Sequence, residues 1–268
     1  MHRRSVIAMV GALGIVALTG VCAARADDAK KDDAPAKLAI SFKVGDSARV
    51  KTNTSISVGG MDIALEQTRK HTIKEIKDKG DVVLETKEEG GKVNVNGTDQ
   101  DIPGGGIVMV TLDKYNKILT YKPDAENPYL SKSTLHLMAL AERIIFPDKA
   151  VKAGDSWKTE IDNPAVKDKK VTIKTTFVGM EKAEGVDAWK VKQTLEAETE
   201  GNGKMTAEVT FLLDASNGQL ISGESELKGV PGQMGPVDFK GKTMRLKAEE
   251  EKKEKKVVAH WQVFGVRG

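Results

Sequence analysis

The chain has 268 residues, of which 30% are charged, 39% hydrophobic and only 4% aromatic. Arg3, Arg4 and Arg25 account for three of its 42 basic residues, so residues 27–268 balance the 39 acidic ones and the net charge of +3 belongs to the leader. A neutral remainder gives no ground for a basic surface that would bind nucleic acid or anionic lipid, so we expect no nucleic-acid partner. The one cysteine, Cys22, lies in the same leader, which excludes disulfides, thiolate catalysis and cysteine-bound metals from the rest of the chain.

The first 26 residues have the pattern of an export signal. Basic residues precede an apolar run at 6–21, and Ala24-Arg25-Ala26 offers the small residues that signal peptidase recognises. The run has about sixteen residues, fewer than the roughly twenty that span a bilayer, and no later segment is apolar for as long. We therefore predict that residues 1–26 are a signal peptide and that the mature protein is periplasmic or extracellular, with no transmembrane segment.

Two variants of this signal are weaker alternatives. Arg3-Arg4 could begin a twin-arginine signal, and Cys22 could carry a lipid. Lipidation requires a small residue directly before the cysteine, whereas Val21 stands there. The twin arginines also serve as an ordinary basic region, so neither alternative changes the predicted export.

Residues 27–37 are charged and lack periodicity, which predicts a disordered linker. From residue 38 to residue 126 the sequence predicts a first β repeat of short antiparallel strands. Gly59-Gly60 and Glu89-Gly90-Gly91 are turn signals, and residues 96–106 are predicted to form a polar loop, which lacks the Lys-Ser/Thr of a phosphate-binding loop. The strands are expected at 38–44, 48–58, 61–76, 82–86, 93–95 and 107–112.

Residues 127–146 are predicted to form one central amphipathic helix. Asn127 is a good N-cap, Pro128 fits the first helical position, and Pro147 ends the helix. His136 lies off the apolar stripe, and we expect its side chain to be solvated. Spacings of three and four residues place on one face Leu130, Thr134, Leu137, Met138, Ala141, Ile144 and Ile145.

Residues 147–268 are predicted to form a second β repeat with a closing C-terminal hairpin. Apolar residues alternate with Lys, Thr and Glu from 171 to 213, which predicts a sheet with one apolar and one solvated face. Ser216-Asn217-Gly218 is a hairpin turn signal, and residues 229–236 form a Gly/Pro-rich loop. The closing hairpin is expected from 239–248 and 257–264.

Three short matches in the same order connect the two repeats. Residues 42–47 match 151–156 through Gly-Asp-Ser, 72–74 match 172–174, and 111–119 match 212–221, with offsets of 109, 100 and 101 residues. A nearly constant offset of this size favours the duplication of a domain-sized unit. The predicted fold class is therefore mainly β: two related antiparallel β units, which form either a curved, half-barrel-like sheet or two lobes, with one central amphipathic helix.

The junction between the repeats contains Pro147, Gly154, Asp155 and Trp157, which we interpret as a structural motif. Pro147 stops the helix, Gly154-Asp155 suits a tight turn, and Trp157 is a large core anchor. The alternative is a ligand or sugar contact formed by Asp155, Ser156 and Trp157. Because Gly-Asp-Ser recurs in the first repeat without the tryptophan, the structural interpretation is favoured.

The stretch from Pro147 to Trp157 resembles the Pro-x-Lys-x-Val-x-x-Gly-Asp-Ser/Thr-Trp signature of bacterial exported proteins and lipoproteins of unknown function. The signature covers about eleven residues, and the strand pattern extends the likeness loosely over most of the chain. The resemblance implies an exported protein with duplicated β-rich domains. It implies no activity and no cofactor.

No pattern in the sequence predicts a catalytic, cofactor-binding or metal-binding residue, and His71, His136 and His260 lie far apart. We therefore expect a non-catalytic envelope protein that binds a lipid or other apolar or amphipathic ligand, or a partner protein of the envelope, on a curved β-sheet. A structural or assembly module of the cell envelope is the alternative hypothesis. A hydrolase is a third.

Overall fold

The computed structural model describes residues 34–58, 61–125, 127, 130–233 and 235–247. The predicted signal peptide, most of the linker, the first Gly-Gly turn and the second strand of the closing hairpin lie outside the described residues. The described chain is mainly β, with twelve strands and one α-helix. Its elements are β1 (Ser47–Val58), β2 (Met61–Ile76), β3 (Val82–Val95), β4 (Thr98–Pro103), β5 (Ile107–Leu112), β6 (Ile118–Pro123), α1 (Lys132–Ala141), β7 (Ser156–Asp162), β8 (Lys170–Ala183), β9 (Val186–Thr199), a 3-10 turn (Glu200–Asn202), β10 (Gly203–Asp214), β11 (Leu220–Gly232) and β12 (Gly235–Arg245).

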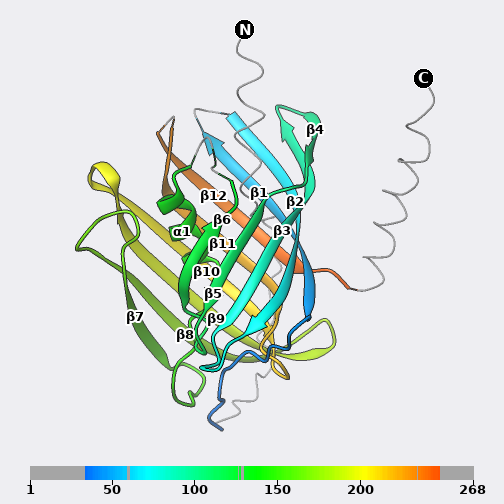
Figure 1. The fold of residues 1–268 in the computed structure, drawn as a ribbon, viewed down its shortest axis with the longest axis vertical. Helices are drawn as coiled ribbons and strands as arrows, with labels where there is room; N and C mark the ends of the chain where they lie inside the picture. Colours follow the sequence, from blue (N-terminus) through cyan, green and yellow to red (C-terminus); the bar gives the residue numbers. More distant parts are fainter. Residues whose placement is uncertain (1–33, 59–60, 126, 128–129, 234, 248–268) are drawn as a thin grey trace, which may run out of the picture.

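The strands form one antiparallel, curved and open sheet (Figure 1). The strand order is β6-β5-β3-β2-β1-β12-β11-β10-β9-β8-β7, and β4 pairs with β3 beside this path. Two meanders, β1 to β6 and β7 to β12, are joined where β1 pairs with β12, for example at Ile56 and Phe239. The two halves therefore form one continuous sheet and not two lobes.

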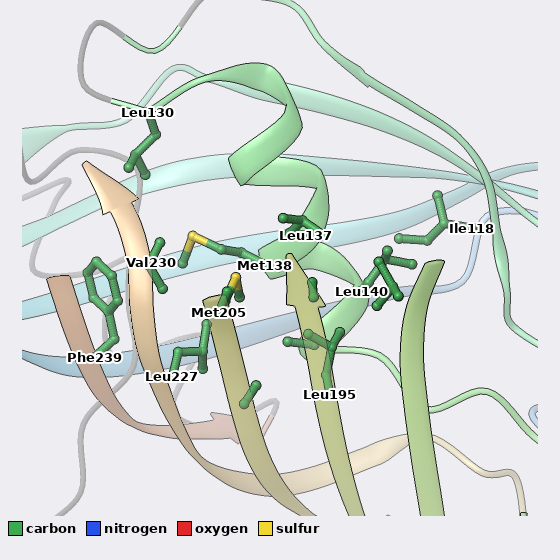
Figure 2. Packing of buried hydrophobic residues seen from close by; sticks show 14 of the residues in the cluster. Ile118, Leu130, Leu137, Met138, Leu140, Leu195, Met205, Leu227, Val230 and Phe239 are labelled. Carbon is green, nitrogen blue, oxygen red and sulfur yellow. The ribbon is translucent and has the colours of Figure 1, made fainter. Parts of the chain in front are cut away.

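The two edges of this sheet are β6 and β7, which are consecutive strands in the sequence. The chain between them has to pass from one edge to the other, and α1 lies in this connection. α1 packs against β6, β9 and β10, and Figure 2 shows its apolar side chains pointing at the strands. The helix therefore belongs to the core of the sheet's inner face.

Sequence alternation determines which face of the sheet is buried. Every second residue of β9 from Trp189 to Ala197 is buried, and β8 and β10 repeat the pattern, as predicted. On the outer face, ion pairs such as Lys204–Glu196, at 2.7 Å, link neighbouring strands. Exposed pairs of this kind contribute about 0–1 kcal/mol each, so burial of the apolar face sets the strand register.

The helix begins later than the sequence predicted. Ser131 is the N-cap, and its Oγ accepts a hydrogen bond from the backbone N–H of Thr134 at 3.1 Å. Asn127 instead accepts from the N–H of Leu130 at 2.9 Å, one turn of chain earlier. The predicted span of 127–146 is therefore wrong at both ends, because a second good cap follows Asn127 and the helix ends at Ala141. The apolar stripe itself is confirmed, since all seven of its residues are buried.

Residues 38–44 do not form the predicted strand. The segment crosses one end of the sheet, where Ala36 pairs with Val151 and the N–H of Ser41 donates to Asn217 O at 2.8 Å. Leu38 is only 2% exposed and packs in a cluster with Phe146. Apolar side chains of this segment pack at the open end of the sheet, and its backbone does not add a strand to the sheet.

Glycine positions account for two further differences. The predicted turn at Gly90-Gly91 lies inside the continuous strand β3, at a register shift opposite β2. A Cβ on Gly91 would lie 1.9 Å from the backbone oxygen of Glu66, so only glycine permits this close approach. The predicted loop at 96–106 contains strand β4, because Asn96 and Gly97 take φ of 53° and 83° and form a tight hairpin turn. Likewise, most of the predicted loop at 229–236 belongs to β11 and β12.

Both meanders begin with the same turn. Gly45 and Gly154 have φ of 89° and 91°, in the region that favours glycine. The Asp46 carboxylate accepts from the N–H of Lys43 at 3.0 Å, and the Asp155 carboxylate accepts from the N–H of Lys152 at 2.8 Å. These hydrogen bonds and φ angles are those expected of a tight turn, in line with the structural interpretation of Gly154 and Asp155.

Strand pairing changes one of the sequence matches between the halves. Ser47 pairs with Thr72, and Ser156 pairs with Thr176. The residue equivalent to Thr72 is therefore Thr176, and the match to Thr172 is out of register by four residues. The match of residues 111–119 with 212–221 does place equivalent turns together, since Asp113 and Asp214 each accept backbone N–H bonds there.

We expect Gly154→Ala and Gly45→Ala each to lower the free energy of unfolding by about 1–2 kcal/mol, because alanine is strained at this positive φ. Denaturant unfolding would measure both effects. Ala150→Ser, at an exposed position close to the second turn, is the control and should have little effect. If Gly154→Ala left the free energy of unfolding unchanged, the proposed role of this turn would be contradicted.

Candidate functional site

A cavity of about 710 Å³ lies between the concave face of the sheet and the chain that leaves α1. Strands β1, β2, β3 and β5 supply one side, β10 and β11 the other, and the N-terminal segment contributes to one end. Its volume falls in the range of roughly 300–1,000 Å³ that is usual for small-molecule sites. Much of its wall is apolar and includes Phe42, Ile73, Leu84, Val110, Phe146 and Phe211.

A belt of polar side chains crosses this wall on β2 and β3. Arg69 and His71 share the inward face of β2 with the buried Ile73, two residues apart each time. Across the strand pair, Arg69 lies opposite Glu88 and His71 opposite Thr86. His71 Nδ1 and Thr86 Oγ1 are 2.8 Å apart. The cavity is therefore amphipathic, with a polar band inside an apolar wall.

The end of α1 is held over the cavity by a glutamine from β9. Gln193 is buried, and its Nε2 donates to the carbonyl oxygens of Leu140, Ala141 and Arg143 at 3.4, 3.3 and 3.0 Å. Thr175 Oγ1 donates to Gln193 Oε1 at 3.3 Å. The last carbonyls of a helix lack partners within the helix, so Gln193 satisfies groups that burial would otherwise leave unpaired.

Two further side chains fix the residues that follow the helix. Asn116, in the β5–β6 turn, donates from Nδ2 to the carbonyl of Ile144 at 2.8 Å. Trp157, at the edge strand β7, donates from Nε1 to the carbonyl of Ile145 at 2.8 Å. Trp157 is half-buried, so it anchors the crossing chain from one edge of the sheet and does not sit deep in the core.

This anchoring places two opposite charges at the cavity. Arg69 Nη1 lies 3.7 Å from Glu142 Oε2, and Arg143 Nη1 donates to Asn116 Oδ1 at 3.1 Å. The Glu142 side chain lines the cavity and keeps 34% of its surface accessible. Partial burial nevertheless raises the pKa of its carboxyl group above the ordinary value. Burial also lowers the pKa of Arg143 to about 10, which leaves it protonated at neutral pH.

The two described histidines occupy this region, contrary to the expectation of a solvated His136. His136 is half-buried and stacks on the Tyr121 ring, with centroids 5.3 Å apart, and burial followed by Lys132 lowers its pKa. Burial raises the pKa of Tyr121 to about 12. Burial, then Arg143 and Arg69, lower the pKa of His71 to about 3. His260 lies outside the described residues.

The predicted motif and the cavity are adjacent but distinct. Phe146 lines the cavity, whereas Pro147, Gly154, Asp155 and Trp157 lie beyond its wall. Sequence reasoning missed Asn116, Gln193 and Arg143, which build the site. Gln193 did give a signal, because it is the one polar residue in the inward row of β9 from 189 to 197.

Neither a metal cluster nor a membrane-spanning helix is found in the described part of the chain. Over residues 34–247, apart from the gaps, no three His, Cys, Asp or Glu side chains gather closely enough to hold a metal ion. Within the same residues, α1 is too short to cross a bilayer.

No protein-family model matches the sequence, and no curated protein matches it either. Among solved structures, the chain is similar to a DUF1329 family protein from Desulfovibrio piger, at 9% sequence identity. The alignment covers 76% of this chain and 85% of that chain, with a TM-score of 0.22. We describe the protein by its fold and its cavity: an open, curved antiparallel sheet with an inner helix and an amphipathic cavity.

We expect Gln193→Leu to lower the free energy of unfolding by about 1–3 kcal/mol, because it leaves buried helix carbonyls without a donor. Gln100→Leu, the same change on the half-exposed strand β4, is the matched control. Denaturant unfolding would measure the difference. Equal effects of the two substitutions would contradict the anchoring role of Gln193.

His71 should make stability depend on pH. Since its folded pKa of about 3 lies below its ordinary value of 6.5, the unfolded chain binds a proton that the folded chain does not, and stability falls as pH drops through this window. Between pH 7 and 4.5 the loss should be about 2–3 kcal/mol. His71→Gln should remove that loss in urea unfolding at the two pH values. An unchanged pH dependence in the variant would show that His71 is not the group responsible.

Proposed function

We propose that this protein is an exported, non-catalytic binding protein that holds an apolar or amphipathic ligand in the cavity between α1 and the concave sheet. Support for export comes from the basic, apolar and small-residue pattern of residues 1–26. Support for binding comes from the cavity, which is the observation that carries the proposal.

The composition of the cavity wall favours an apolar ligand. Phe42, Phe146 and Phe211 approach from three separate parts of the chain, the N-terminal segment, the helix exit and β10. Large apolar side chains around an open volume gain free energy when an alkyl chain or ring replaces water, at about 25 cal/mol per Å² of buried surface. The inner helix leaves this volume open while burying another part of the concave face.

The charges in the cavity favour binding over catalysis. His71 is the histidine in its wall, and a pKa of about 3 makes it a weak base near neutral pH. The side chain of His71 has Thr86 as its hydrogen-bond partner, and its charged neighbours are the cations Arg143 and Arg69. This arrangement disfavours the imidazolium that a nucleophile's general base would form.

Titration with N-phenyl-1-naphthylamine, a neutral apolar dye whose fluorescence rises in apolar surroundings, would test the proposal. We expect saturable binding of one dye molecule per chain. Because the dye carries no charge, its affinity reports the apolar cavity alone. Absence of saturable binding to the folded protein would contradict the proposed function.

Ala48→Phe should weaken dye binding about tenfold or more, which corresponds to about 1.4 kcal/mol. Ala48 is half-buried on β1 and lines the cavity, so an added ring occupies ligand space. Ala150→Phe makes the same change at an exposed position and should bind the dye as the parent does. Equal affinities of the two variants would place the dye elsewhere on the protein.

A further inference from the structure

The charged groups of the cavity are unevenly paired, and this bears on the chemistry of its ligand. Two of its acids hold backbone amides: Asp46 accepts from the N–H of Lys43 at 3.0 Å, and Asp124 accepts from the N–H of Ile107 at 3.0 Å. Asp46 is therefore engaged by its own turn, and Asp124 by the first residue of strand β5. Neither needs a cation from the cavity.

The other two acidic residues of the cavity wall, Glu88 and Glu142, lie near Arg69. Glu88 lies directly across the strand pair from Arg69, and the nearby Arg69 charge lowers the pKa of Glu88 against the larger effect of burial. Glu142 approaches the same guanidinium at 3.7 Å. Among the three arginines in the wall, Arg69 is the one with a carboxylate oxygen within 4.0 Å in the described part of the chain.

Arg143 has a neutral partner instead. Its guanidinium donates to Asn116 Oδ1, a neutral amide oxygen, and in the described residues no carboxylate oxygen lies within 4.0 Å of it. A guanidinium has five N–H donors in a planar fork that matches the oxygens of a carboxylate or phosphate. Arg143 lines the cavity, so its remaining donors can meet a ligand there.

The local field agrees with this geometry. Both Arg143 and Arg69 lower the pKa of His71, after the effect of burial, so positive potential prevails in this part of the cavity. Burial lowers the pKa of Arg143 itself and outweighs the opposing effect of the neighbouring Glu142 charge. An anion beside Arg143 would reduce both of these unfavourable energies.

We propose that the ligand is an amphiphile with one anionic head group, a carboxylate or a phosphate, which Arg143 binds while the alkyl chain lies along the apolar wall. Arg143 is held in place by its own carbonyl's bond to Gln193 and by Asn116. The head group therefore meets a cation whose position is fixed before binding. This inference rests on the proposed function, since it names the class of ligand for the same cavity.

Displacement of N-phenyl-1-naphthylamine by four ligands with the same ten-carbon chain would test the inference. The ligands are decanoate, decyl phosphate, decanol and decyltrimethylammonium, at neutral pH. We expect the two anions to displace the dye at concentrations about tenfold lower than decanol or the cation, because a hydrogen bond to a charged group adds to alkyl burial. Inorganic phosphate alone should neither displace the dye nor compete with decyl phosphate.

Arg143→Met keeps an aliphatic side chain and removes the charge, so it should abolish the preference of the protein for the two anions over decanol. Arg143→Lys should retain part of the preference, since lysine keeps the charge but not the planar fork. Lys192→Met, which removes a cation from the outer face, is the control and should bind like the parent. If Arg143→Met does not fold, the preference of the parent protein among the four ligands still decides.

Equal displacement by decanoate and decanol, or a preference for the cation, would overturn the inference while leaving the proposed function intact. A preference for anions that survives in Arg143→Met would overturn it as well. Inorganic phosphate that competes as strongly as decyl phosphate would identify a free-anion site and contradict the amphiphile. Failure of the parent protein to bind the dye would instead contradict the proposed function.

Discussion

The structure depends on one topological constraint: the chain leaves the sheet at one edge, β6, and returns at the other, β7. In an open curved sheet the connection between these edges crosses the concave face. The crossing chain is therefore buried, and its backbone polar groups need partners that water cannot supply. Gln193, Asn116 and Trp157 provide those partners from three different strands and turns.

The cavity follows from the dimensions of the crossing. A helix of ten residues spans about 15 Å, whereas strands of twelve to sixteen residues run about 40–50 Å. α1 packs over part of the inner face and closes it with Leu137, Met138 and Leu140 (Figure 2). The irregular chain after the helix covers the rest less completely, which leaves the amphipathic volume beside Arg143.

Much of the fold could be predicted from local sequence patterns. Alternation from 171 to 213 correctly assigned the inner face of the second meander. The stripe from Leu130 to Ile145 correctly assigned the buried residues of α1 and of the chain on either side of it. Glycines were harder, because Gly90-Gly91 is equally compatible with a turn and with the irregular stretch of β3 that the structure contains. Residues 38–44 are apolar enough for a strand, but they pack across the open end of the sheet and do not pair with a strand along its length.

The site could not be predicted, because its residues meet only through the crossing chain. Asn116 bonds to a carbonyl 28 residues away, and Gln193 to carbonyls about 50 residues away. His136 was judged from its place on an isolated helix, yet Tyr121 from β6 covers it. The polar residue Gln193 is visible in the sequence as an interruption of the apolar row. Its role depends on the carbonyl groups at the end of the helix, which the sequence does not place beside it.

We propose that the cavity holds an anionic amphiphile in the living cell. Native mass spectrometry of the protein, purified without detergent from the cells that produce it, tests this most directly. We expect a second population that is heavier than the bare chain by the mass of one fatty acid or acidic lipid. This population should be released on denaturation and absent from a preparation of Ala48→Phe. A single population at the mass of the bare chain, or a bound mass equally abundant in Ala48→Phe, would contradict it.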